Sequence, residues 1–218
     1  MKKIRFREVV KNVFLVNFST QYELASTFLR FQEYYESPKF KGKIFTVKQF
    51  KKWYVKNSPQ AKKKRRFTYY GEWNGFNIPS HILGPFYKGL FDPLDKKEKL
   101  LLGLFRRMRR KRFYIIGACK GDKNILKHEI AHGLFYTNLA YRKKVLGIVK
   151  QLDRKSRRGI EKYLLNSGGY DKLVVADETN SYLITELDEL KKNGVDIKKL
   201  EHISSKLKNI LETTIKRG

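Results

Sequence analysis

The sequence predicts an α+β protein that is mostly helical, and three observations point to this class. Of the 218 residues, 41% are hydrophobic, which is enough to bury one sizeable core. Helix caps followed by apolar residues at helical spacing recur along the chain, and the C-terminal half is nearly all helix by this criterion. A short apolar run, Phe113 to Ala118, reads as one buried strand. We expect one domain in two lobes, residues 1–111 and 112–218.

Composition excludes several classes of protein. Aromatic residues make up 14% of the chain and only 5 are Pro, so the net charge of +28 does not indicate disorder. The single cysteine, Cys119, excludes an internal disulfide and a Cys-rich zinc module. The apolar patch from Val9 to Phe18 is interrupted by polar residues and no cleavage site follows, so we expect no export. No apolar run reaches about 18 residues, which predicts a cytoplasmic protein without a membrane span.

The first two helices are predicted from their caps. Ser19-Thr20 followed by Glu23 predicts a helix over residues 20–36 that ends at Ser37-Pro38, with Leu24, Phe28 and Phe31 turned inward. Thr46 and Gln49 repeat the capping pattern, and Phe45 and Phe50 are spaced as a hydrophobic staple. A second helix is therefore expected over residues 47–56.

The middle of the chain is predicted to be irregular. Residues 67–89 are rich in aromatic residues, Gly and Pro, which indicates turns packed onto a core. Asp92-Pro93 suits a helix cap and first helical position, so a third helix is expected from there to about Met108. The strand Phe113 to Ala118 follows it.

The C-terminal half is predicted to hold five helices. Gly121-Asp122 supplies a turn and a cap for a central helix of about sixteen residues, in which apolar side chains surround much of the surface. Further helices are expected over residues 139–152, 157–166, 176–192 and 197–214, with Gly168-Gly169 and Gly194 as stop signals.

Positive charge is concentrated in the first 150 residues. Residues 151–218 carry 14 Lys plus Arg and 11 Asp plus Glu, which leaves a balance of +25 for residues 1–150. The densest runs are residues 62–66 and 106–112. Such runs attract polyanions through counterion release, so nucleic acid is a candidate partner of this half, and a solvated lysine-rich surface is the alternative.

His128-Glu129-Ile130-Ala131-His132 is an H-E-x-x-H pattern on the central helix. A separation of four residues turns the two imidazoles only about 40° apart, so both can reach one metal ion. The Glu129 carboxylate can then reach a metal-bound water rather than the metal, as a general base requires. The alternative is a pair of hydrogen-bonded core histidines, which would leave a buried His-Glu-His cluster in need of other partners.

This segment resembles the active-site helix of the zincin metallopeptidases. The resemblance implies a catalytic lobe at residues 112–218, with Phe113 to Ala118 in the position of the substrate-binding edge strand. It also implies a third zinc ligand. Asp177-Glu178-Thr179-Asn180-Ser181-Tyr182 resembles the N-E-x-x-S-D signature of the gluzincin branch, with Glu178 as the ligand; Tyr182 stands where the family has an Asp that braces the first His. The remaining candidates for the third ligand are Glu161, Glu186 and Glu189.

The function implied by the resemblance is hydrolysis of peptide bonds, with Zn²⁺ held by His128, His132 and Glu178 and with Glu129 as general base. The basic aromatic N-terminal lobe is then a cleft wall or a restraining segment. Tyr170 and Tyr182 are candidates for the donor that stabilises the oxyanion, and Cys119 for an inhibitory ligand or a buried thiol. The alternative function is a nucleic-acid-binding or scaffold protein with a structural or silent zinc site.

Overall fold

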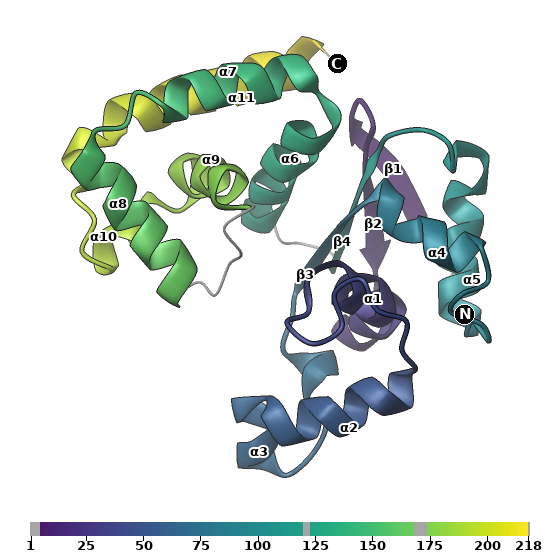
Figure 1. Cartoon of the computed structure of the whole chain (residues 1–218). Helices are drawn as coiled ribbons and strands as arrows, with labels where there is room; N and C mark the ends of the chain where they lie inside the picture. The colour runs from purple at the N-terminus through teal and green to yellow at the C-terminus, as the bar shows by residue number, and fades with distance from the viewer. Residues whose placement is uncertain (1–4, 120–122, 168–173, 218) are drawn as a thin grey trace. The chain divides into compact units, whose positions relative to one another are not determined.

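A computed structural model describes residues 5–119, 123–167 and 174–217 and confirms the α+β class, with about 65% helix and one small mixed sheet. The chain divides into two compact units, residues 1–122 and 123–218, which Figure 1 shows and which are described separately below. The division falls after the strand at 114–119 and not at 111/112, because that strand pairs on both sides within the first unit.

The sheet of the first unit has four strands in the order β1-β2-β4-β3: β1 (Arg5–Val10), β2 (Val13–Phe18), β3 (Gly75–Pro79) and β4 (Tyr114–Cys119). β4 runs parallel to β2 and antiparallel to β3. The predicted strand therefore exists, but its expected place at the edge of the sheet is wrong. Its first five residues are all buried, as a strand with neighbours on both sides requires.

Helix α1 (Gln21–Glu36) packs against this sheet, and its cap is the predicted one, since Thr20 Oγ1 accepts a hydrogen bond from the Glu23 N–H at 3.1 Å. Its inward residues Leu24 and Phe28 are fully buried. A Cβ atom at Gly117 on β4 would lie 2.5 Å from the Phe28 ring and 2.9 Å from Leu24. The close approach of α1 to β4 thus depends on the missing side chain at residue 117.

The next helices are α2 (Val47–Asn57) and α3 (Pro59–Lys64). α2 begins at the predicted capping box, in which Thr46 and Gln49 bond each other's backbone N–H groups. The predicted staple is confirmed, because the Phe45 and Phe50 rings are 6.2 Å apart and both are buried. Pro59 opens α3 as its first residue, a position at which the missing N–H of proline leaves no hydrogen bond unmade.

Residues 67–89 are less irregular than predicted. They contain β3 and three short helical segments, namely η1 (Tyr69–Gly71), η2 (Ser80–Leu83) and α4 (Gly84–Tyr87). The helix α5 (Lys96–Phe105) and the turn η3 (Arg106–Met108) follow. The cap of α5 is Asp95 and not Asp92, because the Asp95 carboxylate accepts hydrogen bonds from the N–H groups of Lys97 and Glu98, both at 2.8 Å.

The second unit is helical in its described residues. Its elements are α6 (Lys123–Thr137), α7 (Leu139–Val149), α8 (Arg154–Lys162), the π-helical turn η4 (Tyr163–Ser167), α9 (Val175–Thr185), α10 (Leu187–Lys192), η5 (Ile197–Lys199) and α11 (Glu201–Arg217). The single helix predicted over residues 176–192 is interrupted at Glu186, whose backbone leaves the helical conformation with φ −133° and ψ 38°. The predicted caps at 121–122 and 168–169 lie outside the described residues.

Helix α9 lies at the centre of this unit. It packs against α6, α7 and α11. Asn180 is completely buried and bonds the Tyr141 hydroxyl of α7, with its Nδ2 3.3 Å away. Ser204 of α11 donates a hydrogen bond of 2.6 Å to the Leu183 carbonyl. These contacts fix the face of α9 that is turned toward α6.

Two glycines test the packing of α1 on β4. Gly117→Ala should lower the free energy of unfolding by about 1–3 kcal/mol, because the added methyl group overpacks the contact with Phe28. Gly103→Ala is the matched control, since Gly103 lies within α5 and nothing stands within 4 Å of an added Cβ. It should raise stability by about 0.5–1 kcal/mol. Equal effects of the two substitutions in urea unfolding would contradict this account of the packing.

Candidate metal centre

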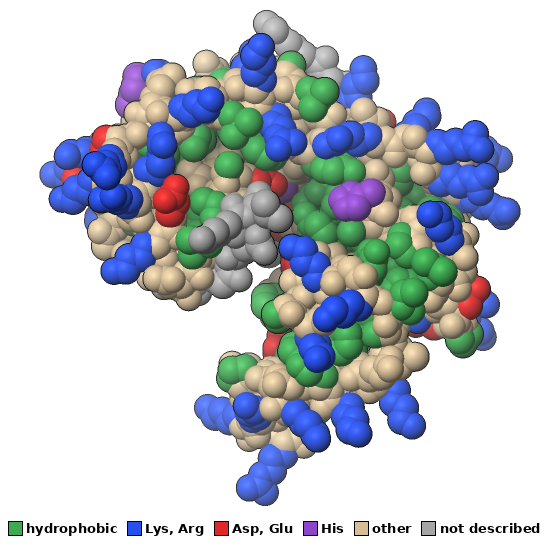
Figure 2. Space-filling view, in the orientation of Figure 1, with side chains coloured by type: hydrophobic (Ala, Val, Ile, Leu, Met, Phe, Trp, Pro, Cys, Tyr) green, Lys and Arg blue, Asp and Glu red, His purple; other side chains and the backbone are tan. Residues whose placement is uncertain are grey.

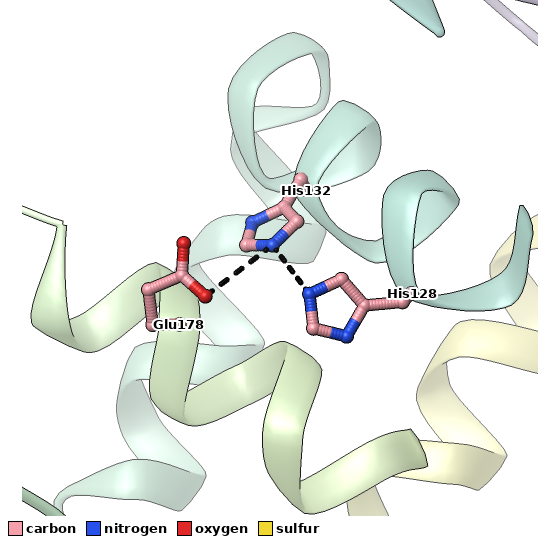
Figure 3. A group of neighbouring side chains, drawn as sticks. All are labelled: His128, His132 and Glu178. Atoms are coloured by element: carbon pink, nitrogen blue, oxygen red, sulfur yellow. Dashed lines mark hydrogen bonds and ion pairs between the residues drawn. The ribbon is translucent and has the colours of Figure 1, made fainter. Parts of the chain in front are cut away.

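The two histidines of the H-E-x-x-H pattern lie one turn apart on α6 and turn their rings toward the same point, as Figure 3 shows. Their Nε2 atoms are 3.0 Å apart and their ring centroids 4.8 Å apart. Two imidazole ligands of a tetrahedral zinc ion, at about 2.0–2.1 Å each, have their nitrogens about 3.3 Å apart. The helix therefore holds the pair close to the spacing that one metal ion requires.

The third member of the cluster is Glu178, in the first turn of α9. Its Oε2 lies 3.6 Å from His132 Nε2. One ligand atom each from His128, His132 and Glu178 lie within 4.8 Å of one another, and this is the only such group in the described part of the chain. The structure thus brings together all three residues predicted to hold a metal. The group could bind a metal ion.

The rival carboxylates do not join this group. Glu189 lies on α10, where it is paired with Lys192 at 3.8 Å on the exposed surface, and Glu161 lies on α8. Glu186 does approach the site, but from the other side of an imidazole ring: its Oε1 is 2.8 Å from Nδ1 of His128. Glu186 is therefore placed to support a ligand and not to be one.

The outer nitrogen of His128 has two partners. Besides Glu186, the Thr185 hydroxyl oxygen lies 3.0 Å from Nδ1. That hydroxyl donates its own hydrogen to the Ser181 carbonyl at 2.8 Å, so its oxygen is left to accept from the ring N–H. Both partners lie at the end of α9, about one turn after Tyr182.

The outer nitrogen of His132 is held by Asp177, whose Oδ1 lies 3.0 Å from Nδ1. Asp177 stands where the gluzincin signature has an Asn. Asp177 thus pairs with His132, and Glu186 pairs with His128. The sequence does not predict the supporting roles of Asp177, Thr185 and Glu186, although two of them carry charges on the face that α9 turns to α6.

These contacts determine which nitrogens are available for a metal. Because the Nδ1 atoms face oxygen acceptors, the hydrogen of each neutral ring is assigned to Nδ1, and each Nε2 carries a lone pair. Two lone pairs 3.0 Å apart repel each other unless a cation or a proton lies between them. Among the described residues, none donates a hydrogen bond to Oε2 of Glu178, which is buried. Two nitrogen lone pairs and one unsatisfied carboxylate oxygen fit a metal cation well.

The charges around the cluster also favour a cation at this position. Burial by itself lowers the pKa of His132, but Asp177, Glu178 and Glu129 outweigh it and raise this pKa to about 10. Burial raises the pKa of Glu178 to about 7, against the opposing effect of His132. In the absence of a metal the cluster therefore retains protons at neutral pH. A metal ion that binds here replaces protons as the positive charge among these carboxylates.

Glu129 lies beside the cluster and outside the group of potential ligands. It follows His128 directly on α6, it is 9% exposed, and its charge contributes to the pKa of both His132 and Glu178. The geometry separates it from the three residues that could bind the ion.

The other predicted residues take up different positions. Tyr182 is 7% exposed and packs edge-on against the His128 ring, with a centroid distance of 5.7 Å, and against Tyr163 at 5.6 Å. Tyr170 lies outside the described residues. Cys119 is a half-buried free thiol of the first unit that packs against its hydrophobic core, and burial raises its pKa. A thiol that resists ionisation is a poor zinc ligand, which favours the buried-thiol interpretation.

Comparisons of the chain with protein-family models, with curated proteins and with solved structures find no match. None of the helices in the described ranges is long and apolar enough to cross a bilayer. The functional argument therefore depends on the geometry of the cluster.

Removal of the carboxylate ligand gives the first test of the site. Glu178→Ala should weaken binding of Zn²⁺ or Co²⁺ by more than about 100-fold, because a direct ligand matters more than the outer partners, which are worth about 10–100-fold. Glu189→Ala is the control, since it removes a carboxylate from the exposed surface of the same unit. Calorimetric titration of both variants measures the difference. Similar affinities in the two variants would show that Glu178 is not a ligand.

Removal of the supporting carboxylates gives the second test. Asp177→Asn and Glu186→Gln should each weaken metal binding by about 10–100-fold while the stoichiometry stays unchanged, because each substitution removes a charge that orients an imidazole. Glu189→Gln removes the same charge from the surface and should have no such effect. If Glu186→Gln binds metal as tightly as Glu189→Gln, the assignment of Glu186 as the brace of His128 is wrong.

Proposed function

We propose that this chain is a zinc-dependent metallopeptidase of the gluzincin type, with His128, His132 and Glu178 as ligands and Glu129 as general base. One observation carries the proposal. Two imidazole nitrogens and a buried carboxylate oxygen converge on one point, while a second buried glutamate lies next to that point but outside the ligand group. Metal-assisted hydrolysis needs this combination of three ligands and one separate base.

The donor set favours zinc over other metals. Two neutral imidazoles and one carboxylate are ligands that Zn²⁺ accepts in hydrolytic sites, whereas Mg²⁺ and Ca²⁺ prefer oxygen ligands alone. Three protein ligands leave a fourth position open for water or substrate. The outer nitrogen of His132 faces the carboxylate of Asp177, and that of His128 faces the carboxylate of Glu186 and the hydroxyl of Thr185. Metal-bound imidazoles usually have partners of these kinds.

A zinc ion held by His128, His132 and Glu178 would supply a nucleophilic water at neutral pH and a Lewis acid for the carbonyl of the scissile bond. Glu129 accepts the proton of the attacking water and passes it to the leaving amine. His128 and His132 keep their orientation through Glu186, Thr185 and Asp177, so the ligands need not reorganise during the reaction. The Tyr182 ring closes one side of the site against His128.

A structural or silent zinc site is the competing hypothesis, and Glu129 discriminates the two. A purely structural site is normally closed by a fourth protein ligand, and it gains nothing from a buried glutamate beside the metal. Glu129 is buried beside the candidate ligands, where its carboxylate can serve a function at the metal. Catalysis by Glu129 is such a function.

Replacement of the base tests the proposal. Glu129→Gln should retain metal and fold but lower the turnover of a broad peptide library by about 10²–10⁴-fold, because general base catalysis contributes that much. Glu189→Gln should leave turnover unchanged, and a chelator should abolish it in the unsubstituted protein. Peptide hydrolysis that survives both Glu129→Gln and the chelator would refute the function. Zinc loss in Glu129→Gln would instead make Glu129 a ligand.

A further inference from the structure

The first unit carries most of the positive charge, and one segment of it contains no acidic residue. Residues 1–122 hold 29 Lys plus Arg against 9 Asp plus Glu. Within residues 37–71 there are 12 Lys plus Arg and no Asp or Glu. This segment includes α2 and α3, and Figure 2 shows Lys and Arg side chains projecting from that region at the lower edge of the view.

An apolar groove of about 410 Å³ opens on this segment, between α2 and the residues that precede it. The buried rings of Phe40 and Phe45 form its floor, and the partly exposed Trp53 ring meets the Phe40 ring edge-on at 5.5 Å. Ile44 stands beside them with 58% of its surface exposed. The groove is therefore both apolar and open to solvent.

Four lysines surround the aromatic rings, namely Lys39, Lys43, Lys52 and Lys56. All four are exposed, and none of them forms an ion pair with a carboxylate of the described residues. Their charges are thus available to an external anion. The capping box at the start of α2 and the packing of Phe45 on Phe50 keep the groove's framework rigid.

We propose that this groove binds single-stranded nucleic acid, with phosphates on the lysines and an unstacked base on the partly exposed ring of Trp53. Positive charge that follows a groove, combined with aromatic rings inside it, is the arrangement by which proteins hold single strands. A duplex keeps its base faces stacked and can use only the lysines. An anionic bilayer binds side chains that protrude into it, whereas these rings lie in a concavity.

This inference concerns the first unit alone and does not depend on the proposed peptidase activity. Its tests use the full chain and measure binding of nucleic acid, whereas the test of the peptidase proposal measures peptide hydrolysis. Either proposal can therefore fail without affecting the other. The groove also refines the sequence-based expectation of a polyanion partner, because it names residues 39–57, which include α2, as the surface instead of the two densest basic runs.

Salt dependence tests the role of the lysines. The full chain should bind oligo(dT) with an affinity that falls steeply between about 50 and 200 mM salt. Lys52→Gln with Lys56→Gln should reduce the slope of log affinity against log salt by about 0.7 for each phosphate that is no longer neutralised, and weaken binding by about tenfold. Lys143→Gln with Lys144→Gln, two exposed lysines of α7, is the charge-matched control. Equal reductions in affinity for the two double variants would overturn the proposal, because only net charge would then matter.

Tryptophan fluorescence tests the role of the rings. The chain has two tryptophans, and only Trp53 lies in the groove, while Trp73 is 52% exposed elsewhere in the unit. Oligo(dT) should quench the fluorescence of Trp73→Phe, which retains Trp53, and leave that of Trp53→Phe nearly unchanged. The reverse result would overturn the proposal. Duplex DNA that binds as tightly as oligo(dT), or phosphatidylserine vesicles that bind when oligo(dT) does not, would also overturn it.

Discussion

Two histidine nitrogens face each other at 3.0 Å in the second unit, a spacing that requires either a hydrogen or a metal ion between them, and the unit is organised around this pair. His128 and His132 are placed by the turn of α6, and burial makes their repulsion costly. The carboxylates of Glu178 and Asp177 lie beside them, and no Lys or Arg of the described residues forms an ion pair with either carboxylate. A proton can occupy the gap, as the raised pKa of His132 shows, but three converging donor atoms suit a metal ion better.

Most residues that contact the two histidines of α6 come from one helix, α9. Its first turn provides the third candidate ligand, Glu178, and the partner of His132, while its end provides Thr185 and then Glu186 for His128. The departure from helical conformation at Glu186 ends α9 where its carboxylate is required. The register of α9 against α6, fixed by its contacts with α7 and α11, therefore determines the metal centre and the orientation of both imidazoles.

The features that could be predicted from the sequence are those set by residues close together in the chain. The spacing of His128 and His132 on a helix, and the capping box of α2, follow from neighbouring residues and are found as expected. The β1–β2 hairpin is not predicted, because Lys11-Asn12 is a two-residue turn whose signal is weak, although Asn12 adopts φ 63° there. The interior place of β4 and the break at Glu186 depend on partners distant in the chain, which no local pattern reports.

The zinc K-edge absorption spectrum of the purified full chain tests the central claim most directly. We predict four nitrogen or oxygen neighbours at about 2.0–2.2 Å, two of them with the scattering pattern of imidazole, and no sulfur. Such a shell corresponds to His128, His132, Glu178 and one exchangeable oxygen. A sulfur neighbour at about 2.3 Å, as Cys119 would give, or a shell without imidazole would contradict the account.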